Sequence, residues 1–205
     1  EGGGLKRKRR AFKGIEFFHA QKIYNLDLTI GGNLFEDDGY RKSEKTSRKR
    51  FNFSAKYRPS KIKGLSYGIS GNFLKQSSGY MLVWNGYDEA YIPLKNEKST
   101  TEGQTYNIDP FITYIDSKNR HSLQTRYLKV INDNSTNDKD NMQDNESDLF
   151  YADYQWQRNL AKYNLRVTTG LTNEMVYARS DIFEGEYVRS NHAAYMQLDK
   201  KWRRL

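Results

Sequence analysis

YNLDLTIGGNLFED, residues 24–37, opens the pattern that decides the fold of this chain. Apolar and polar side chains alternate in it, and a period of two puts all the apolar side chains on one face of a β-strand. The pattern returns in RFNFSAKYR (50–58) and LSYGISGNF (65–73). The three segments predict amphipathic strands, with a long polar loop at Gly39–Ser47 and a tight turn at Pro59–Lys63.

The alternation continues along the chain, and helical spacing with capping residues is missing. We therefore expect an all-β fold, an antiparallel up-and-down meander of about nine strands. Pro110 is expected to weaken the fifth strand, because proline lacks a ladder donor. The expected strands are Ala11–Ala20, Tyr24–Asp37, Arg48–Arg58, Leu65–Gln76, Thr105–Asp116, His121–Asp133, Leu149–Arg158, Tyr163–Asn173 and Asn191–Trp202.

Short and long connections alternate between these strands. In a meander, this rhythm puts the tight turns at one end and the large loops at the other, as in outer-membrane barrels. The strands also reach the roughly nine to eleven residues that cross a bilayer, so we expect the meander to be part of a transmembrane β-barrel. The short connections are Gln21–Ile23, Pro59–Lys63, Ser117–Arg120 and Asn159–Lys162, and the long ones are Gly39–Ser47, Ser77–Gln104, Asp133–Asp148 and Glu174–Ser190.

The composition fits a sheet with an apolar outer band and a wet interior. Only 36% of the 205 residues are hydrophobic, which is little for a filled core, while 16 Tyr and 10 Phe argue against disorder. No run approaches about 18 consecutive apolar residues, so a transmembrane helix is not expected. The absence of cysteine excludes disulfides and thiolate metal sites.

The net charge is +9, and its densest part is the run Lys6–Arg10. Such a run suits nucleic-acid binding, but no helix-turn-helix, zinc-finger or RNP pattern accompanies it. We interpret residues 1–10 as a basic N-terminal extension and expect no nucleic-acid partner. Residues 11–205 form the expected partial barrel. The chain starts without Met or an apolar signal segment, which predicts a fragment or a processed piece.

Aromatic side chains recur near the predicted strand ends. Tyr and Trp favour the headgroup zone of a membrane, where the ring is buried and the polar atom stays hydrated. Ordinary cross-strand packing in a soluble sheet is the alternative explanation. The residues concerned are Tyr24, Tyr57, Tyr67, Tyr106, Tyr114, Tyr163 and Trp202.

Several segments together resemble the barrel of TonB-dependent outer-membrane receptors, most of all those of Bacteroidetes-type bacteria. The likeness lies in the residue pattern of the strands and in the order of the loops, including the pattern GGN-x-x-x-x-x-GY. It extends over about residues 24–202. It carries no information about a substrate. The segments are LDLTIGGNLFEDDGY (26–40), RFNFSAKY (50–57), LSYGISGNF (65–73), YNIDPFITY (106–114) and RHSLQTRY (120–127).

The resemblance implies a mid-barrel segment of a transporter in the bacterial outer membrane, without the plug domain, TonB box or closing aromatic strand of the family. The whole receptor would take up a scarce nutrient: an iron chelate, haem, a cobalamin or an oligosaccharide. Its implied partners are outer-membrane lipid and lipopolysaccharide, its own plug domain, the TonB complex reached through that plug, and a surface lipoprotein.

Two sets of residues are candidates for contact with a ligand or a partner. Aromatic side chains in the long loop Ser77–Gln104 are suited to stack on a sugar, a haem or an aromatic chelator, or to pack on each other; they are Tyr80, Trp84, Tyr87 and Tyr91. Polar side chains on the inward strand faces would line a lumen or bind a plug; they are Asn25, Asp27, Asn52, Lys56, Arg126 and Arg166.

No catalytic constellation emerges, so we expect neither an enzyme nor a cofactor or metal site. The histidines His19, His121 and His192 lie on different predicted strands, whereas a metal site needs converging ligands. The Asp-rich loop Asp133–Asp148 fails the spacing of an EF-hand and predicts a solvated loop. The carboxylates at Glu36–Asp38 have no identifiable second group for acid–base chemistry.

The alternative function is a soluble all-β module that binds a carbohydrate or a protein, and an outer-membrane β-barrel enzyme is a third. The surroundings of one row of apolar residues distinguish the transporter barrel from the soluble module. The row faces lipid in a barrel and forms the protein core in a sandwich. The row is Leu26, Leu28, Ile30, Phe51, Phe53, Leu165 and Val167.

Overall fold

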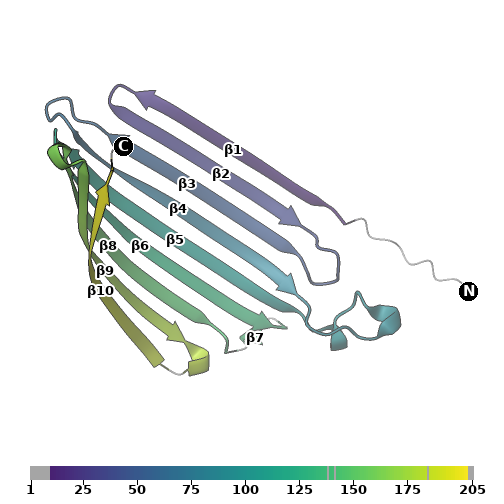
Figure 1. Ribbon diagram of the computed structural model, residues 1–205. Coiled ribbons are helices and arrows are strands. Elements are labelled where there is room, and N and C mark those ends of the chain that lie inside the picture. The colour runs from purple at the N-terminus through teal and green to yellow at the C-terminus, as the bar shows by residue number, and fades with distance from the viewer. Residues whose placement is uncertain (1–9, 138, 141, 184, 203–205) are drawn as a thin grey trace, which may run out of the picture.

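The computed structural model describes residues 10–137, 139–140, 142–183 and 185–202 and shows one large antiparallel sheet (Figure 1). Its strands are β1 (Phe12–Ile23), β2 (Leu26–Asp37), β3 (Thr46–Tyr57), β4 (Leu65–Tyr80), β5 (Ser99–Ile115), β6 (Asn119–Thr136), β7 (Lys139–Asp140), β8 (Asn145–Leu160), β9 (Leu165–Ser180) and β10 (Gly185–Lys200). Short 3-10 helices interrupt the connections: η1 (Tyr87–Glu89), η2 (Leu94–Asn96), η3 (Ala161–Tyr163) and η4 (Asp181–Phe183). No helix in the described parts is long and apolar enough to cross a membrane.

The strands follow one another across the sheet in the order of the sequence. Nine of them form a continuous path from β1 to β10, and the two-residue β7 pairs only with β6. The predicted all-β antiparallel meander of about nine strands is confirmed. The sheet curves without closing, so β1 and β10 are open edges among the described residues (Figure 1). The predicted basic extension lies outside the described residues except for Arg10.

The first turn lies later than the sequence predicts. Gln21–Ile23 belongs to β1, and Ile23 pairs with Leu26, so the turn consists of Tyr24 and Asn25 alone. Tyr24 has a φ of 52°, in the left-handed region that tight two-residue hairpins use. Its side chain continues the apolar alternation of β2, and this is why the pattern wrongly extends that strand into the turn.

Several strands are longer than predicted, and the loops between them are correspondingly shorter. β4 and β5 stay paired from Leu65↔Tyr114 to Tyr80↔Ser99, so their connection is 81–98. The predicted loop Glu174–Ser190 is wrong: β9 and β10 pair over most of it, and only 181–184 connects them. The extensions of β4 and β5 are mostly polar on both faces, and those of β9 and β10 mix apolar and polar residues without strict alternation, so ladder hydrogen bonds form where no alternation marks a strand.

The connections fall into two groups at opposite ends of the strands. We call one the turn end, with residues 24–25, 58–64, 116–118 and 161–164, and the other the loop end, with residues 38–45, 81–98, 137–144 and 181–184. The predicted contrast in length is clear for 81–98, but 38–45 and 137–144 are only one residue longer than the turn-end connection 58–64. It is absent for the last, because η4 makes a compact link there.

Pro110 is accommodated without a change of register. β5 keeps its pairing with β4 through Ile69↔Pro110, while the pairing with β6 skips from Ile108↔Tyr127 to Phe111↔Gln124. The Thr125 hydroxyl donates a hydrogen bond to the Pro110 carbonyl oxygen at 3.0 Å. A side chain thus replaces part of the ladder that proline interrupts.

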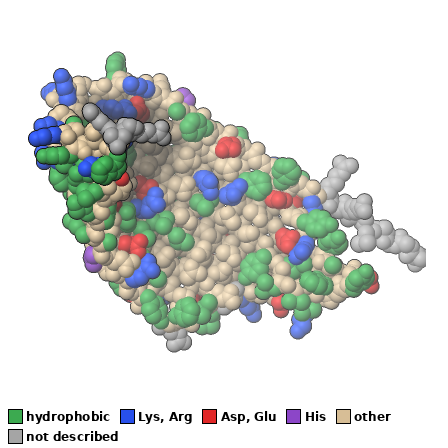
Figure 2. All heavy atoms as spheres, viewed as in Figure 1, with side chains coloured by type: hydrophobic (Ala, Val, Ile, Leu, Met, Phe, Trp, Pro, Cys, Tyr) green, Lys and Arg blue, Asp and Glu red, His purple; other side chains and the backbone are tan. Residues whose placement is uncertain are grey.

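Apart from Pro93 in the connection 81–98, no apolar side chain among the described residues is buried. The buried side chains of the strands are polar: Ser122 and Thr168, which are 7% and 6% exposed and lie on the same face of the sheet. Figure 2 looks into this hollowed face, where charged side chains of both signs stand among hydrophobic side chains, other polar groups and backbone. The curvature shelters polar groups and leaves the apolar face outside, which inverts the arrangement of a soluble domain.

Aromatic rings cover glycines on neighbouring strands and stiffen the single layer. Phe17 lies over Gly32, and Phe53 lies over Gly71, so that a Cβ at either glycine would collide with the ring. On the polar face, Tyr195 of β10 crosses Gly170 of β9 and reaches Gln155 of β8, whose amide donates to its hydroxyl at 3.2 Å. Such aromatic cover is a known way to stabilise glycines in sheets.

Candidate functional site

The first candidate surface is the apolar face of the sheet. Seven apolar residues, from Leu26 to Val167, are expected to distinguish a barrel from a sandwich. The strand register places all seven on this face. Exposure is high along it and reaches 67% at Met196 and 61% at Leu171. The face also includes Ile69, Phe73, Tyr106, Ile108, Ile112, Leu123, Tyr127, Phe150, Tyr154 and Leu198.

The apolar face is banded along the strands. On β2 to β5 and on β8, its middle row consists of small and aliphatic side chains in register from strand to strand: Leu28, Ala55, Ile69, Pro110 and Ala152. On β1, β6, β9 and β10 the same row holds the polar side chains Gln21, Thr125, Asn173 and His192. Aromatic rings flank this row toward both ends of the strands. Aliphatic groups between two aromatic rows match the distribution found across a bilayer.

The two aromatic rows are held by contacts between strands. Toward the loop end, Phe73 packs on Tyr106 with ring centroids 5.0 Å apart. Toward the turn end, Tyr57 packs on Tyr67 at 5.7 Å, and His121 bonds to the Tyr154 hydroxyl at 2.8 Å. Of the predicted boundary aromatics, Tyr57, Tyr67, Tyr106 and Tyr114 lie in these rows, while Tyr24, Tyr163 and Trp202 lie at the turn end beyond the strands.

The second candidate surface is the hollowed polar face. Of the predicted inward residues, Asp27, Asn52, Lys56, Arg126 and Arg166 lie on it, spread over four strands. Asn25 does not, because it belongs to the first turn and bonds to Ser60. The set forms a polar lining and does not converge on one point.

Several charged groups on the polar face are paired. The Arg126 guanidinium donates two hydrogen bonds to the Asp109 carboxylate, at 2.7 and 2.9 Å, and Arg189 forms an ion pair with Glu174 at 2.8 Å. Tyr151 lies in register between Arg126 and Glu174, and these three residues line a shallow pocket together with Asp109. Because each of these carboxylates already has a cation, the pocket offers hydrogen bonds to a polar solute or a covering protein segment, and no free acid–base pair.

The predicted loop aromatics do not converge. Tyr80 ends β4, and Tyr87 is 97% exposed on η1. Trp84 faces Pro93 in an isolated β-bridge inside the loop. Tyr91 alone reaches another loop, so the structure does not bring the four rings into one stacking site.

Tyr91 joins two loops of the loop end, 81–98 and 38–45. Its ring meets that of Tyr40 edge-on at a centroid distance of 5.2 Å, and the two hydroxyl oxygens are 3.1 Å apart. The backbone N–H of Lys42 also donates to the Tyr91 carbonyl oxygen at 3.0 Å. The hydrogen bond to Tyr91 raises the pKa of Tyr40, because it stabilises the neutral phenol. Sequence reasoning did not find Tyr40, since its partner is far along the chain.

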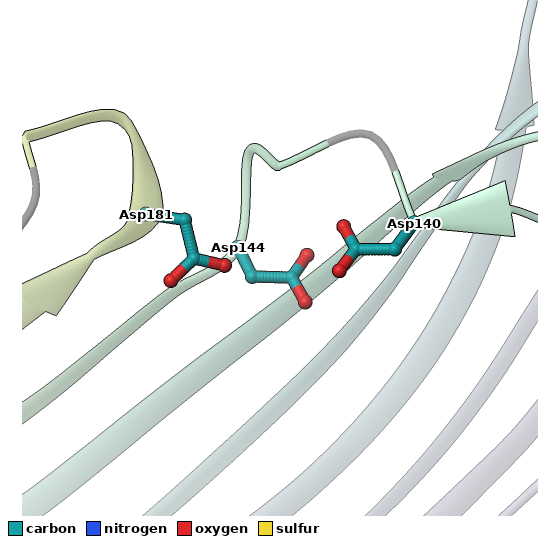
Figure 3. A group of neighbouring side chains, drawn as sticks. All are labelled: Asp140, Asp144 and Asp181. Carbon is teal, nitrogen blue, oxygen red and sulfur yellow. The ribbon is translucent and has the colours of Figure 1, made fainter.

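Three carboxylates meet at the loop end (Figure 3). Asp140 and Asp144 come from the β6–β8 connection and Asp181 from η4, and one carboxylate oxygen of each lies within 4.8 Å of the others. Backbone N–H groups orient two of them: Asn134 donates to Asp144 at 2.6 Å and Met142 to Asp140 at 2.7 Å. Oxygen donors of this kind suit hard cations such as Ca²⁺. The sequence could not show Asp181, because only the sheet register brings η4 to this loop.

At the turn end, Asp116 organises the tightest of the polar turns. It accepts hydrogen bonds from the Asn119 side chain and from the backbone N–H groups of Lys118 and Asn119, the latter two at 2.7 and 2.6 Å. These donors lower the pKa of the Asp116 carboxyl from 3.8 to about 2. The carboxylate therefore stays ionised, and the turn keeps its bonds, well below neutral pH.

Comparison with known proteins adds no relative. No protein-family model matches the chain, and no curated protein gives a significant sequence match.

The contact between Tyr40 and Tyr91 predicts that replacing Tyr91 loosens loop 81–98. The variant Tyr91→Ala should be cut severalfold faster by trypsin after the exposed Lys95, because a loop that loses its anchoring contact opens more often. The control is Tyr87→Ala, which removes a solvated ring and should leave the cleavage rate unchanged. Equal rates for the two variants would contradict an anchoring role for Tyr91.

Proposed function

We propose that this chain is a section of the wall of an outer-membrane β-barrel of the TonB-dependent receptor type, which takes up a scarce nutrient. The observation that carries the proposal is the exposed apolar face, with no described apolar side chain buried beneath it. A large apolar side chain gains about 1.5–3 kcal/mol when it leaves water. A face this extensive therefore requires a cover, and lipid supplies one.

The dimensions of the apolar face support a bilayer as its cover. Tyr106 and Tyr114 bound the aliphatic part of β5, and they are about 27 Å apart along the strand at about 3.4 Å per residue. A strand tilt of about 40° reduces this to about 20 Å across the membrane, near the apolar band of about 25 Å in such barrels. The aromatic rows then lie at the two headgroup zones.

The open edges support a wall that further strands complete. Backbone groups in a bilayer need partners, and only a closed barrel supplies them to every strand. Because nine strands follow the path from β1 to β10, these two edges run in the same direction. Antiparallel closure therefore requires additional strands, as expected for a receptor with a larger barrel.

The polar face is the proposed lumen lining. Its paired charges, such as Arg126 with Asp109, tolerate water or a hydrogen-bonded plug domain beside them. The loop end faces the cell exterior, where a substrate or surface lipoprotein first meets the protein, and the turn end faces the periplasm. Energy for uptake comes through the TonB complex and the plug, and the chain itself performs no chemical reaction.

A soluble binding module is the second candidate, and it requires a second protein layer on the apolar face. The banding of that face favours the membrane. A sandwich core has no reason to separate a middle row such as Leu28, Ala55 and Ile69 from two aromatic rows, whereas a bilayer does.

Thiol labelling tests the position of the wall. In a cysteine-free background of the complete protein, Leu123→Cys probes the apolar face and Gln124→Cys the polar face of the same strand. In isolated outer membranes, a water-soluble maleimide should modify Leu123→Cys roughly tenfold more slowly, because lipid suppresses the thiolate that reacts. Denaturation in detergent should equalise the rates. Equal rates in the native membrane, or recovery of the protein in the soluble fraction, would contradict the proposal.

Nutrient uptake tests the activity. A strain that lacks the complete gene should grow more poorly than the complemented strain when one nutrient is scarce: iron chelate, haem, cobalamin or oligosaccharide. The defect should disappear when that nutrient is abundant and should also follow loss of TonB, because transport depends on energy from the inner membrane. Equal growth under all four limitations would contradict a role in uptake.

A further inference from the structure

Two neighbouring arginines on the polar face near the loop end have no carboxylate bound to them. Arg48 and Arg50 belong to β3 and lie on the same side of it, about 7 Å apart along the strand. Arg50 is exposed, and no described residue forms an ion pair or a hydrogen bond with its side chain. The Arg48 guanidinium lies over the Phe35 ring of β2, 5.4 Å from its centroid. The pair therefore presents two positive charges on the hollowed side of the sheet.

The side chains next to Arg50 on the polar face carry no negative charge. Its register partners are Asn33 on β2 and Leu74 on β4. A counter-charge for Arg50 must therefore come from farther away or from a ligand. The diagonal neighbours on the same two strands are also uncharged: Gly31, Phe35, Asn72 and Gln76.

By strand register, the nearest carboxylates on this face are those of Asp37 and Glu16. Asp37 is a diagonal neighbour of Arg48, and its carboxylate accepts a hydrogen bond from the backbone N–H of Gly39 at 2.8 Å. Glu16 on β1 is two strands away from Arg50, about 10 Å at the usual strand spacing. Neither carboxylate forms an ion pair with a described arginine. A single diagonal carboxylate thus accompanies two guanidinium groups, which keep a net positive charge.

Most other strand arginines of the polar face are bound within the sheet. Arg126 and Arg189 have carboxylate partners, and Arg166 donates a hydrogen bond to the Asn159 side chain at 3.1 Å. Arg120 near the turn end has uncharged register partners, but no second arginine stands beside it. The β3 pair is therefore the only set of neighbouring arginines on the described polar face that lacks a hydrogen-bond partner.

Amide side chains extend this donor-rich surface. Four of them flank the two arginines on β2, β3 and β4, and none forms a hydrogen bond with a described residue. In the other half of the sheet, amides bond to their neighbours, as Gln157 does to Thr168 at 3.2 Å. We call the unbound group the arginine patch; it consists of Arg48, Arg50, Asn33, Asn52, Asn72 and Gln76.

Guanidinium and amide N–H groups suit a ligand that carries carboxylates. A guanidinium donates two parallel hydrogen bonds to a carboxylate, and the opposite charges strengthen them. The Phe35 ring restrains Arg48, so binding costs this side chain less freedom. A neutral ligand would leave both positive charges unpaired, whereas carboxylates would compensate them.

We propose that the arginine patch binds the carboxylates of the transported nutrient through paired hydrogen bonds, so that the substrate is a carboxylate chelate of iron or haem. The inference rests on the proposed function, which places the polar face in the lumen and the loop end toward the cell exterior. Haem carries two propionate groups, and carboxylate chelates of iron are also anionic, so either one satisfies both arginines. A neutral oligosaccharide does not, and neither does cobalamin, whose phosphate balances the charge of its cobalt.

Binding of four probes to the complete protein in detergent micelles tests the substrate class. The probes are haemin, ferric citrate, cyanocobalamin and maltoheptaose, one for each kind of nutrient. Haemin or ferric citrate should bind, because only these two bring carboxylates to the patch. Binding of cyanocobalamin or maltoheptaose, or binding of no probe at all, would overturn the proposal.

The exposed Arg50 provides the variant that tests the contact. Arg50→Gln should weaken binding of the carboxylate probe roughly tenfold, because it removes charge-assisted hydrogen bonds. Arg120→Gln is the matched control: it removes another exposed arginine of the polar face, near the turn end, and should bind like the unmodified protein. If the two variants bind the probe with the same affinity, the arginine patch is not the binding site.

Arg50→Lys tests the shape of the contact. Lysine keeps the positive charge but replaces the planar fork of the guanidinium with a single ammonium group. Binding should therefore weaken severalfold although the net charge is unchanged. An affinity equal to that of the unmodified protein would mean that charge alone attracts the ligand, and it would overturn the paired hydrogen bonds that we propose.

The proposed function and the substrate class fail in different ways. Slower thiol labelling of Leu123→Cys than of Gln124→Cys, together with no binding of either carboxylate probe, refutes the arginine patch alone. Equal labelling of the two positions refutes the proposed function, whatever the probes do. Arg50→Gln should reach the membrane like the unmodified protein, because no described residue depends on a bond to Arg50. Failure of this variant to fold would show a structural role for Arg50 and would overturn the proposal.

Discussion

A single-layer sheet cannot bury its own apolar face, and this constraint governs everything else in the structure. The hydrogen-bond ladders join the strands from β1 to β10, yet they bring no second layer over Ile108 or Phe150. The hydrophobic effect normally closes a domain around its core. Here the apolar surface lies on the outside, so only a cover from outside the sheet removes it from water. The fold is therefore stable only together with whatever covers that face, and the banding of aliphatic and aromatic rows fits a bilayer.

The polar face, unlike the apolar face, satisfies many of its side chains within the sheet. Several of its charged groups are paired, as Arg126 is with Asp109, and its buried hydroxyls lie where the curvature shelters them. Hydrogen bonds between neighbouring strands, such as that from Gln157 to Thr168 at 3.2 Å, hold this lining in place. A lining of this kind stays hydrated without becoming a catalytic site, which suits a wall around a transport path.

The sequence predicts the faces of this sheet well and the ends of its strands poorly. A period of two assigns Leu26, Phe53 and Val167 to one face, because side-chain direction depends only on position along a strand. It does not show that β9 and β10 continue after Glu174, because Met175, Val176 and Tyr177 follow one another without the alternation that marks a strand. Tyr24 misleads in the opposite direction, since an apolar ring in a turn looks like one more strand position.

The candidate sites show the same division. The polar lining follows from alternation, with Asn25 as the error that the misplaced turn produces. The contacts that depend on register were beyond the sequence: Tyr40 with Tyr91, Asp181 with Asp144, and Arg48 over Phe35. Each contact joins segments that become neighbours only through the register of strand pairing.

The most direct test of the lipid-facing sheet is a nitroxide scan along β5 in the complete protein, reconstituted in liposomes. Accessibility to oxygen, which concentrates in lipid, should peak at Tyr106, Ile108 and Ile112, while accessibility to a water-soluble nickel chelate should peak at Asn107 and Thr113. This alternation with a period of two is the result that a bilayer predicts. Low accessibility to both probes at Ile108 and Ile112 would mean that protein covers the apolar face, and it would contradict the account.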